Sequence, residues 1–422
     1  MTFVTTRNFA STAAAGSDWR SVTRKLLEVL EPLRQRDEPF NLGFLYVSDH
    51  LAADTANILS LMRSVTGIEN WVGAVGLGVC SCGEDYVDTP AASVLVGTFP
   101  EDSFRVFPVT EVALPGAREI LGPWLDHNEA LLSLVHGDPL ADQDPLRIIA
   151  ALEHLTGGFI AGGLSASRSE HVIIADQAAS GGVGGVVFSA DIPVMSALSQ
   201  GCAPIGPAHM ITKAEGNVIM ELDGQPAFAV FTHDLKSMAL TRAGEEPDSA
   251  RIHEILIDED APELHEDVAR LFKGEIHIAF PVTGSDRNDY LVRNLLGVDA
   301  ESGWLAVPQT VHTGASVMFV HRDDETVRND LIRTLLELRD RVIREQGRFA
   351  PQGGIYISCV ARAMTDFSAG TDDMGGHSPA PGGEMALIRS ILGDIPLAGF
   401  YANGEISNQR LYGYTGVLIL FL

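Results

Sequence analysis

Short apolar runs and a few helical stripes alternate along this chain. Residues 18–33 and 324–346 place apolar side chains at helical spacing, with polar and charged side chains on the other face. Most other apolar runs are short and end at glycine, asparagine or aspartate, which is typical of strands joined by turns. The pattern predicts a mixed α/β (α+β) fold, with partly antiparallel sheets flanked by helices, and not a strictly doubly wound fold.

The two ends of the chain share one order of elements: strand, amphipathic helix, glycine-containing strand, loop, strand. The matching segments are 42–50, 56–67, 70–80 and 92–99 near the N-terminus, and 353–362, 384–394, 395–407 and 415–422 near the C-terminus. The helical stretches ILSLMRSVTG and MALIRSILGD agree nearly position by position in their apolar pattern. We therefore expect an internal repeat that folds as two pseudo-symmetric halves. Between them, residues 111–144 read as a connection with a helix at 124–136.

The charge and composition of the chain narrow the classes of molecule that it could bind and the compartments where it could occur. The formal net charge is −27, so the surface repels phosphate backbones, which argues against nucleic acid and anionic membranes as partners. The four scattered cysteines do not form a secreted disulfide framework. The N-terminus lacks a secretory apolar region, and no window of 18 uninterrupted apolar residues is present. We expect a cytoplasmic protein.

Common catalytic and cofactor motifs do not match. No lysine stands where a P-loop needs one, and the glycines of GGVGGVVF lie between strands instead of opening a helix. Neither a G-x-S-x-G elbow nor a complete H-E-x-x-H motif is present. From these residues we expect no metal site and no catalytic residues.

Three polar features stand out in apolar or glycine-rich surroundings. Arg362 follows the strand IYISCVA, where a guanidinium can hold a carboxylate with paired hydrogen bonds. Glu405 follows the strand IPLAGFYA and could hold an ammonium group. Together they suit a small zwitterion; the alternative is a structural Arg–Glu pair that closes the sheet. The third feature is a rigid proline- and glycine-rich turn at 200–207. The predicted ligand-binding residues are Arg362, Glu405, Tyr401, Asn403, Gly399, Gly404, Gln200, Cys202 and Gly206.

Two blocks together resemble the FIST family of bacterial sensory proteins, which carry FIST N and FIST C regions. They are QGCAPIG at 200–206 and GFYANGEI at 399–406, which match the family's QGC-x-PIG and GF-x-x-x-GEI cores. The resemblance covers nearly everything from about residue 25 onward. It implies a FIST N-like region at 25–231 and a FIST C-like region at 232–422, after a tail at 1–24, with the boundary within 225–262.

The resemblance implies a small-ligand-binding sensory protein in bacterial signal transduction, which senses amino acids and is not an enzyme. Its output would pass through a separate signalling partner, such as a histidine kinase or a cyclase. One alternative is a haem-binding nitric-oxide sensor, because some family members are implicated in haem binding. Its axial ligand would come from His50, His171, His209 or His312. The other alternative is an unrecognised enzyme that uses Cys202 or Glu405, with His209 as the nearest candidate base to Cys202.

Overall fold

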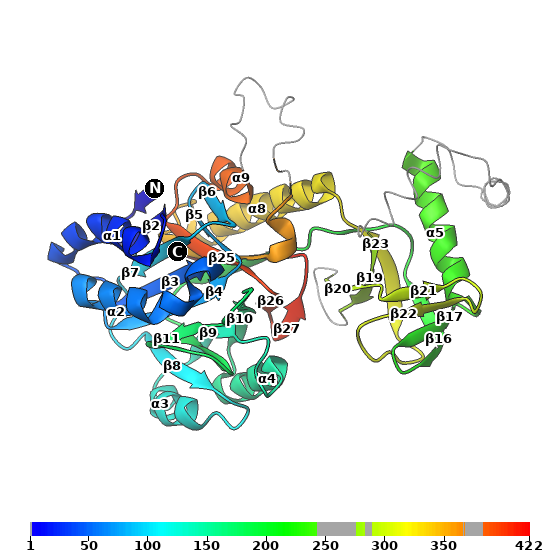
Figure 1. The fold of residues 1–422 in the computed structure, drawn as a ribbon, viewed down its shortest axis with the longest axis horizontal. Helices are drawn as coiled ribbons and strands as arrows, with labels where there is room; N and C mark the ends of the chain where they lie inside the picture. The colour runs from blue at the N-terminus through cyan, green and yellow to red at the C-terminus, as the bar shows by residue number, and fades with distance from the viewer. Residues whose placement is uncertain (1, 243–275, 283–288, 366, 368–382) are drawn as a thin grey trace, which may run out of the picture. The chain divides into compact units, whose positions relative to one another are not determined.

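The computed structural model describes residues 2–242, 276–282, 289–365, 367 and 383–422 (Figure 1). The chain divides into two compact units: unit 1 is Met1–Gln200 with Arg328–Leu422, and unit 2 is Gly201–Val327. The boundary that the sequence places within 225–262 falls inside unit 2 and partly outside the described residues. The compact units therefore divide the chain at other points than the two sequence regions do.

Unit 1 opens with an edge strand, β1 (Thr2–Thr5), and a first repeat of strands and helices. Asp18 caps the first helix, because its side chain accepts a hydrogen bond from the Ser21 N–H while the Ser21 hydroxyl accepts one from the Asp18 N–H. The first repeat consists of β2 (Phe9–Ala15), α1 (Trp19–Leu30), η1 (Glu31–Gln35), β3 (Leu42–Ser48), η2 (Asp49–Asp54), α2 (Thr55–Thr66), β4 (Asn70–Gly76), β5 (Gly78–Ser81), β6 (Glu84–Val87) and β7 (Ala91–Gly97).

The main strands of the first repeat lie in the order β2-β7-β3-β4. Strands β3 and β4 are parallel, as a β-α-β connection through α2 requires. Strand β7 returns antiparallel to β3, and β2 is antiparallel to β7. The sheet is therefore mixed, which confirms the expected fold class.

A second repeat follows directly, which the sequence analysis did not detect. The segment 124–136 was expected to be helical, but 130–137 is a strand, so that prediction is wrong. The second repeat consists of β8 (Phe104–Thr110), α3 (Pro115–Leu125), β9 (Ala130–Gly137), α4 (Pro145–Thr156), β10 (Phe159–Leu164), β11 (Ile173–Ala175), β12 (Gln177–Ala179) and β13 (Val183–Ser189). Its order, β8-β13-β9-β10, repeats that of the first sheet, with β9 and β10 parallel.

The third repeat is interrupted by unit 2, which is inserted between its first strand and its first helix. The third repeat consists of β14 (Val194–Ser199), α8 (Asp324–Gln346), β24 (Gly353–Cys359), η3 (Val360–Arg362), α9 (Glu384–Leu392), β25 (Leu397–Ala402), β26 (Glu405–Ser407), β27 (Arg410–Tyr412) and β28 (Gly416–Phe421). Its order, β14-β28-β24-β25, is again the same. The predicted match between the two ends of the chain is confirmed, but the two-half arrangement is corrected to three repeats.

Each repeat completes the sheet of another repeat with its hairpin. The first repeat's hairpin β5-β6 pairs with β25 of the third sheet, the second repeat's hairpin β11-β12 pairs with β4 of the first, and the third repeat's hairpin β26-β27 pairs with β10 of the second. The exchange runs in a ring, so every sheet of unit 1 contains strands from two repeats.

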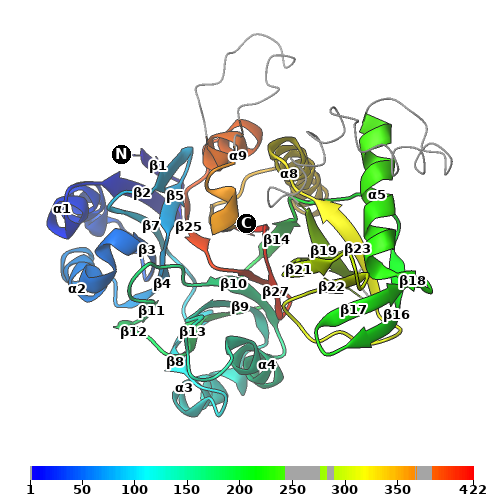
Figure 2. The ribbon, with the colours of Figure 1, turned by 45° about the vertical axis from the view of Figure 1, so that its right-hand side comes forward.

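Helices cover the outer faces of these sheets. In Figures 1 and 2, α1 and α2 lie beside the strands of the first sheet, α3 and α4 beside those of the second, and α8 and α9 beside those of the third. The inner faces share one core, in which the ring of Phe421 contacts the rings of Phe9, Phe99 and Phe188. These contacts join all three repeats.

In its described residues, unit 2 is an antiparallel sheet packed against the helix α5 (Ala227–Arg242). The aromatic ring of Phe231 on the helix lies 4.9 Å from that of Phe319 on the sheet. Its described elements are β15 (Ala203–Pro204), β16 (His209–Glu215), β17 (Val218–Leu222), β18 (Gln225–Pro226), α5 (Ala227–Arg242), β19 (Ile276–Pro281), β20 (Tyr290–Asn294), β21 (Gly297–Asp299), β22 (Trp304–Ala306) and β23 (Ser316–His321).

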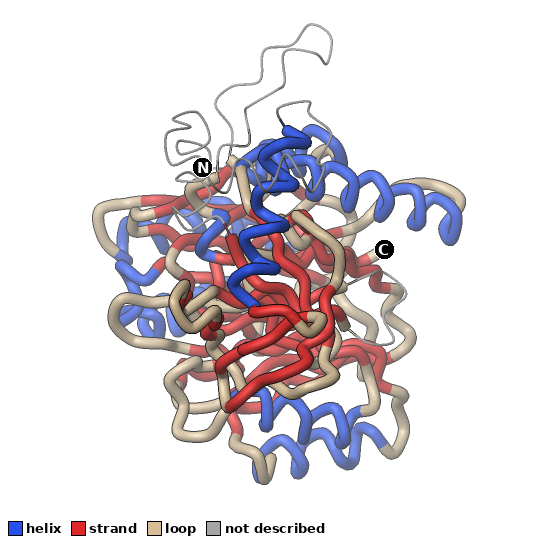
Figure 3. The backbone as a smooth tube through the Cα atoms, turned by 90° about the vertical axis from the view of Figure 1, so that its right-hand side faces the viewer, coloured by secondary structure: helices blue, strands red, loops and turns tan. Residues whose placement is uncertain are grey.

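Strand content exceeds helix content along the part of the chain that the structure describes (Figure 3). Among those residues, none of the helices combines the length and the apolar character needed to cross a membrane.

Candidate functional site

Three glycines define equivalent positions in the three repeats. Gly73, Gly162 and Gly399 lie on β4, β10 and β25, and each pairs with the parallel strand beside it and with a hairpin strand from another repeat. A Cβ atom at any of them would lie 1.7–1.8 Å from a carbonyl oxygen of the parallel strand, so only glycine fits there. These glycines serve as reference points: residues at the same number of positions from them, along the strand or across the pairing, are equivalent in the three sheets.

The outer faces of the first two sheets are apolar at these positions. Ile58 of α2 and Ile148 of α4 lie at the same distance before the C-terminal glycine of their helices, and both are fully buried. The remaining outer-face residues are Leu45, Val47, Val75, Ile174 and Ala178 in the first sheet, and Val135, Gly137, Leu164, Ile406 and Leu411 in the second. The fold therefore accepts an ordinary hydrophobic layer here.

The third sheet carries polar or ionisable side chains at the same positions. Its residues are Tyr356, Ser358, Tyr401, Cys80 and Asp85 on the strands and Glu384 on α9. With Arg362, which follows β24, we call this set the third-sheet cluster. Five of its members are at most 1% exposed: Glu384, Tyr356, Arg362, Ser358 and Cys80.

An ion pair lies at the centre of the third-sheet cluster. The Arg362 Nε lies 2.8 Å and its Nη2 2.6 Å from the same oxygen, Oε1 of Glu384. The Tyr356 hydroxyl donates to this oxygen at 2.6 Å, and the Ser358 hydroxyl donates to the other at 2.6 Å. Burial lowers the pKa of Arg362, but the Glu384 carboxylate outweighs it and the net shift is upward, so the arginine stays charged.

A second carboxyl group lies at the same end of α9. The Asp85 side chain accepts a hydrogen bond from the Met385 N–H at 3.1 Å and another from the Tyr401 hydroxyl at 2.7 Å. Burial raises the pKa of Asp85 to about 7, in spite of these two donors. This group therefore changes charge near neutral pH, beside a carboxylate that is fixed by Arg362.

Glu405 is completely buried in β26, next to the third-sheet cluster. Its Oε2 accepts hydrogen bonds from the Thr415 hydroxyl at 2.6 Å and from the Thr415 N–H at 3.2 Å, whereas its Oε1 has no hydrogen-bond partner in the structure. Burial raises its pKa to about 8, against the opposing effects of Thr415 and Arg362. Arg362 thus acts electrostatically on Glu405, but its direct partner is Glu384, a residue that the sequence analysis missed.

The predicted residues do not all gather at this place. Tyr401 and Arg362 belong to the cluster, and Glu405 adjoins it. Asn403 is exposed, and its backbone N–H donates to the Leu164 carbonyl. Gly399 and Gly404 serve the backbone: Gly399 meets its parallel strand closely, and Gly404 has a φ of 114° at the turn.

The signature block at 200–206 spans the junction between the units. Gln200 ends unit 1, where its N–H donates to the Asp330 carboxylate at 2.7 Å. Cys202 and Gly206 belong to unit 2. Cys202 is buried, and its carbonyl accepts a hydrogen bond from the Tyr290 hydroxyl. A Cβ on Gly206 would lie 2.2 Å from the Asp234 carboxylate, so this glycine lets α5 approach the turn.

His209 is bound on both sides. Its Nδ1 lies 2.7 Å from Asp223 and its Nε2 lies 2.9 Å from Asp234. Burial lowers the pKa of His209, but the two carboxylates outweigh it and the net shift is upward. Both ring nitrogens of His209 are thus occupied by carboxylate partners and not by a metal or by Cys202.

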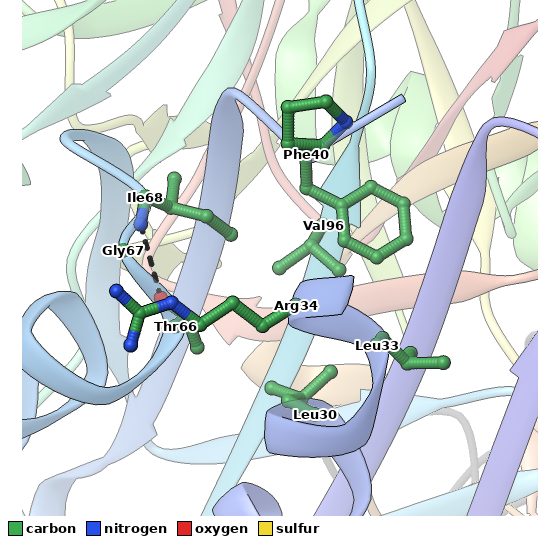
Figure 4. Close-up of a pocket in the computed structure, with 9 residues that line it drawn as sticks. Leu30, Leu33, Arg34, Phe40, Thr66, Gly67, Ile68 and Val96 are labelled. Atoms are coloured by element: carbon green, nitrogen blue, oxygen red, sulfur yellow. Dashed lines mark hydrogen bonds between the residues drawn. The ribbon is translucent and has the colours of Figure 1, made fainter. Parts of the chain in front are cut away.

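Two pockets lie elsewhere in unit 1. One, of about 190 Å³, is lined by residues including Leu30, Phe40 and Val96, and the Arg34 side chain extends toward Thr66 (Figure 4). The other, of about 140 Å³, is lined by Leu131, Leu132, Phe159, Val194, Ser196 and Ile419. Both are smaller than the usual ligand pocket of about 300 Å³ or more.

In the part of the chain that the structure describes, the four candidate haem-ligating histidines lie apart from these two pockets. Neither pocket is lined by a histidine. His312 is exposed, and the Nδ1 of His50 lies 3.2 Å from Asp49. His171 is half-buried outside both pockets, and His209 is held by two carboxylates.

The sequence reasoning found Arg362 and Tyr401 because they end buried strands. It missed Glu384 and Asp85, since a glutamate at the start of a helix and an aspartate in a hairpin are ordinary surface patterns. The signal was available in the repeat: when the two helices are aligned on their C-terminal glycines, Gly67 and Gly393, Glu384 stands where the matching helix has Ile58, one residue before the stretch MALIRSILGD. An aligned repeat would have shown a charge at a core position.

Comparison with known proteins agrees with this chain's signature blocks. The model of the FIST N domain matches residues 41–225 and that of the FIST C domain matches residues 252–408. An uncharacterised protein of Mycobacterium tuberculosis is 28% identical over 372 residues, which covers 83% of each chain. An uncharacterised protein of Mycobacterium bovis is 26% identical over 377 residues, which covers 87% of this chain and 86% of that one. FIST domains are associated with sensing in signal transduction. The chain belongs to the FIST family.

Proposed function

We propose that this protein is a small-ligand-binding sensory protein and that its ligand acts at the third-sheet cluster. One observation carries the proposal: the third sheet has ionisable groups where two equivalent sheets have a hydrophobic layer. Buried ion pairs are often no more stabilising than apolar side chains of similar volume. A reason other than stability is therefore needed for keeping them in one repeat out of three, and ligand recognition supplies it.

Amino acids are the first ligand class to test. The cluster and Glu405 present one guanidinium and several carboxyl groups, which match the carboxylate and the ammonium of an amino acid. The output would pass to a separate signalling protein, such as a histidine kinase or a cyclase. Family members are regarded as sensory domains and not as enzymes, which agrees with this role.

A thermal-shift screen of the amino acids tests the proposal. A ligand present at one hundred times its Kd adds about 2.7 kcal/mol to stability, which raises the melting temperature by several degrees. Tyr401→Phe removes the hydroxyl that contacts Asp85 and should abolish or strongly reduce the shift. Tyr86→Phe is the matched control, because it removes a hydroxyl that contacts Glu84 outside the cluster.

Two results would count against the proposal. One is a wild-type protein that no amino acid stabilises. The other is a ligand-induced shift of equal size in the wild type and in Tyr401→Phe, which would place the ligand elsewhere.

A further inference from the structure

A chain of hydrogen bonds leads from the third-sheet cluster to a buried serine and an aspartate. The Arg362 Nη1 donates to the Ser199 Oγ at 3.3 Å, and the Ser199 hydroxyl donates to Oδ2 of Asp330 at 2.8 Å. The Gln200 N–H donates to the same oxygen at 2.7 Å. Ser199 is 1% exposed and Arg362 fully buried, so the path from Glu384 to Asp330 runs through the interior of unit 1.

This path ends at both crossings of the chain between the two units. Ser199 and Gln200 are the last residues before the chain enters unit 2, and Asp330 lies just after it returns at Arg328. One carboxylate therefore binds the outgoing segment to the incoming one. All of these contacts lie within unit 1.

The other repeats show that this connection is specific to the third. Between β2 and α1 the chain needs only residues 16–18, and between β8 and α3 only residues 111–114. At the corresponding point of the third repeat, between β14 and α8, the chain carries unit 2 apart from residues 324–327, which form the first turn of α8. In the described chain, the repeat that holds the insertion is also the repeat whose outer face is polar. Two independent features thus coincide in one place.

We infer that Arg362, Ser199 and Asp330 couple the third-sheet cluster to the two crossings, so that a change at Glu384 alters how firmly the crossings are held. The inference rests on the proposed function, because a ligand at the cluster would compete for the groups that orient Arg362. Unit 2 then takes part in the response through its two attachment points.

The physical basis of the coupling is that the single guanidinium group of Arg362 contacts both Glu384 and Ser199. Its Nε donates to Glu384, and its Nη2 lies within ion-pair distance of the same carboxylate, while its Nη1 reaches Ser199 and the Tyr414 carbonyl. The guanidinium is planar and rigid, so a turn at one edge moves the other edge with it. A group that draws Glu384 or Arg362 away weakens the contact with Ser199, so the Ser199 oxygen loses its Arg362 donor and the hydroxyl that donates to Asp330 is held less firmly.

Hydrogen–deuterium exchange of the segments 196–204 and 324–334 tests the coupling without any ligand. Glu384→Gln removes the charge that holds Arg362, and we expect exchange at the Gln200 amide to become roughly tenfold faster, as for a weakened charge-assisted hydrogen bond. Asp138→Asn is the matched control: Asp138 is also a buried carboxylate, in the second repeat, where it binds the N–H groups of Leu140 and Gly181. Its substitution should leave Gln200 unchanged.

A second pair of variants isolates the path. Ser199→Ala removes the linking hydroxyl and should itself accelerate exchange at Gln200, and Glu384→Gln should then add nothing further. Tyr356→Phe removes one donor from Glu384 and serves if Glu384→Gln does not fold; we expect a smaller change of the same sign.

The coupling is wrong if folded Glu384→Gln and Tyr356→Phe both exchange at Gln200 at the wild-type rate, or if Asp138→Asn accelerates it equally. This outcome is distinct from failure of the proposed function. Accelerated exchange in Glu384→Gln with no amino acid response would uphold the coupling and reject the ligand. A ligand that stabilises the protein while Gln200 stays at the wild-type rate in Glu384→Gln would do the reverse.

Discussion

Arg362 is a buried cation whose charge is balanced by the Glu384 carboxylate. Removal of one partner of such a pair leaves the other charge in a low-dielectric interior, and this costs far more than the pair itself contributes. The sequence supported two interpretations of Arg362 equally well: a residue that contacts a ligand, or one member of a structural ion pair. The structure shows an ion pair, with Glu384 as the partner of Arg362, and the contact with a ligand remains our proposal.

We therefore expect Arg362→Ala to lower the free energy of unfolding by about 3–5 kcal/mol. Urea unfolding at neutral pH measures the change. Arg24→Ala is the control, because Arg24 is 72% exposed and 3.8 Å from an exposed Glu28, and a surface pair of this kind contributes about 1 kcal/mol or less. Equal losses of unfolding free energy in the two variants would mean that removing Arg362 does not leave a costly unpaired charge on Glu384.

Glu405 gives the protein a pH dependence of definite sign. Its pKa is about 8 in the folded protein and about 4.3 in an unfolded chain, so the folded state binds more protons between these values. Stability is then highest at the acidic end of this range and falls as the pH rises toward 8, by at most about 1.4 kcal/mol per pH unit. Asp85 contributes in the same direction up to about pH 7.

Glu405→Gln should flatten this dependence, since the amide resembles the protonated carboxyl and does not ionise. Unfolding midpoints at pH 5, 6, 7 and 8 for the wild type and the variant give the comparison. The interval from pH 7 to 8 is the most informative, because Asp85 is already half ionised at pH 7 and its contribution fades above that pH. A wild-type stability that rises over this interval while the variant's stays level would contradict the raised pKa.

At the scale of elements, the three equivalent glycines decide whether strands can pair. Their neighbours' carbonyl oxygens occupy the space where a side chain would begin, and Gly73 and Gly162 also have φ values of 155° and 157°. The sequence repeat already contained glycines in two of these three strands. Their role, which is to allow close approach of the neighbouring strand, could be inferred only from the strand pairing.

Gly73→Ala, Gly162→Ala and Gly399→Ala should each destabilise the protein by about 3 kcal/mol or more, because a packed sheet cannot move away from the added methyl group. Thermal denaturation compares them with Gly122→Ala in α3, where a Cβ meets nothing within 4 Å and alanine favours the helix. If one of the three is tolerated like Gly122→Ala, that glycine is not equivalent to the others.

Much of the fold could be predicted from the hydrophobic pattern, and the wrong prediction for β9 has a physical cause. Long amphipathic segments such as α1 and α8 were predictable, because many turns of one apolar face reinforce each other. Strand β9 was read as helix because an apolar run flanked by polar residues fits either period when both faces are buried. That error hid the second repeat, and with it the comparison that reveals Glu384 as an exception.

At the scale of the whole molecule, unit 2 is an insertion into one of three repeats, and the other two make the same connection with a few residues. The Gln200 N–H lies 2.7 Å from the carboxylate of Asp330, so the two ends of the insertion are close together within unit 1. Close ends are typical of inserted domains, which can be removed without breaking the host's core.

We expect unit 1 to fold cooperatively when 201–327 is replaced by a short glycine–serine linker. The first repeat makes the same connection with residues 16–18 alone, so the geometry permits it. Circular dichroism and a single thermal transition measure the result. A truncated chain that shows no cooperative transition would indicate that unit 2 is part of the core and not an addition to it.

The exchange of hairpins around the ring has a consequence for synthesis on the ribosome. The hairpin β5-β6 leaves the ribosome early, yet its partner strand β25 comes near the end of the chain: Ser81 and Leu397, which share a hydrogen bond, are 316 residues apart. At about 5–20 residues per second, this hairpin waits on the order of tens of seconds for its neighbour. The nascent chain therefore carries an open strand edge through most of translation, when pairing with another nascent chain competes with completion of its own sheet.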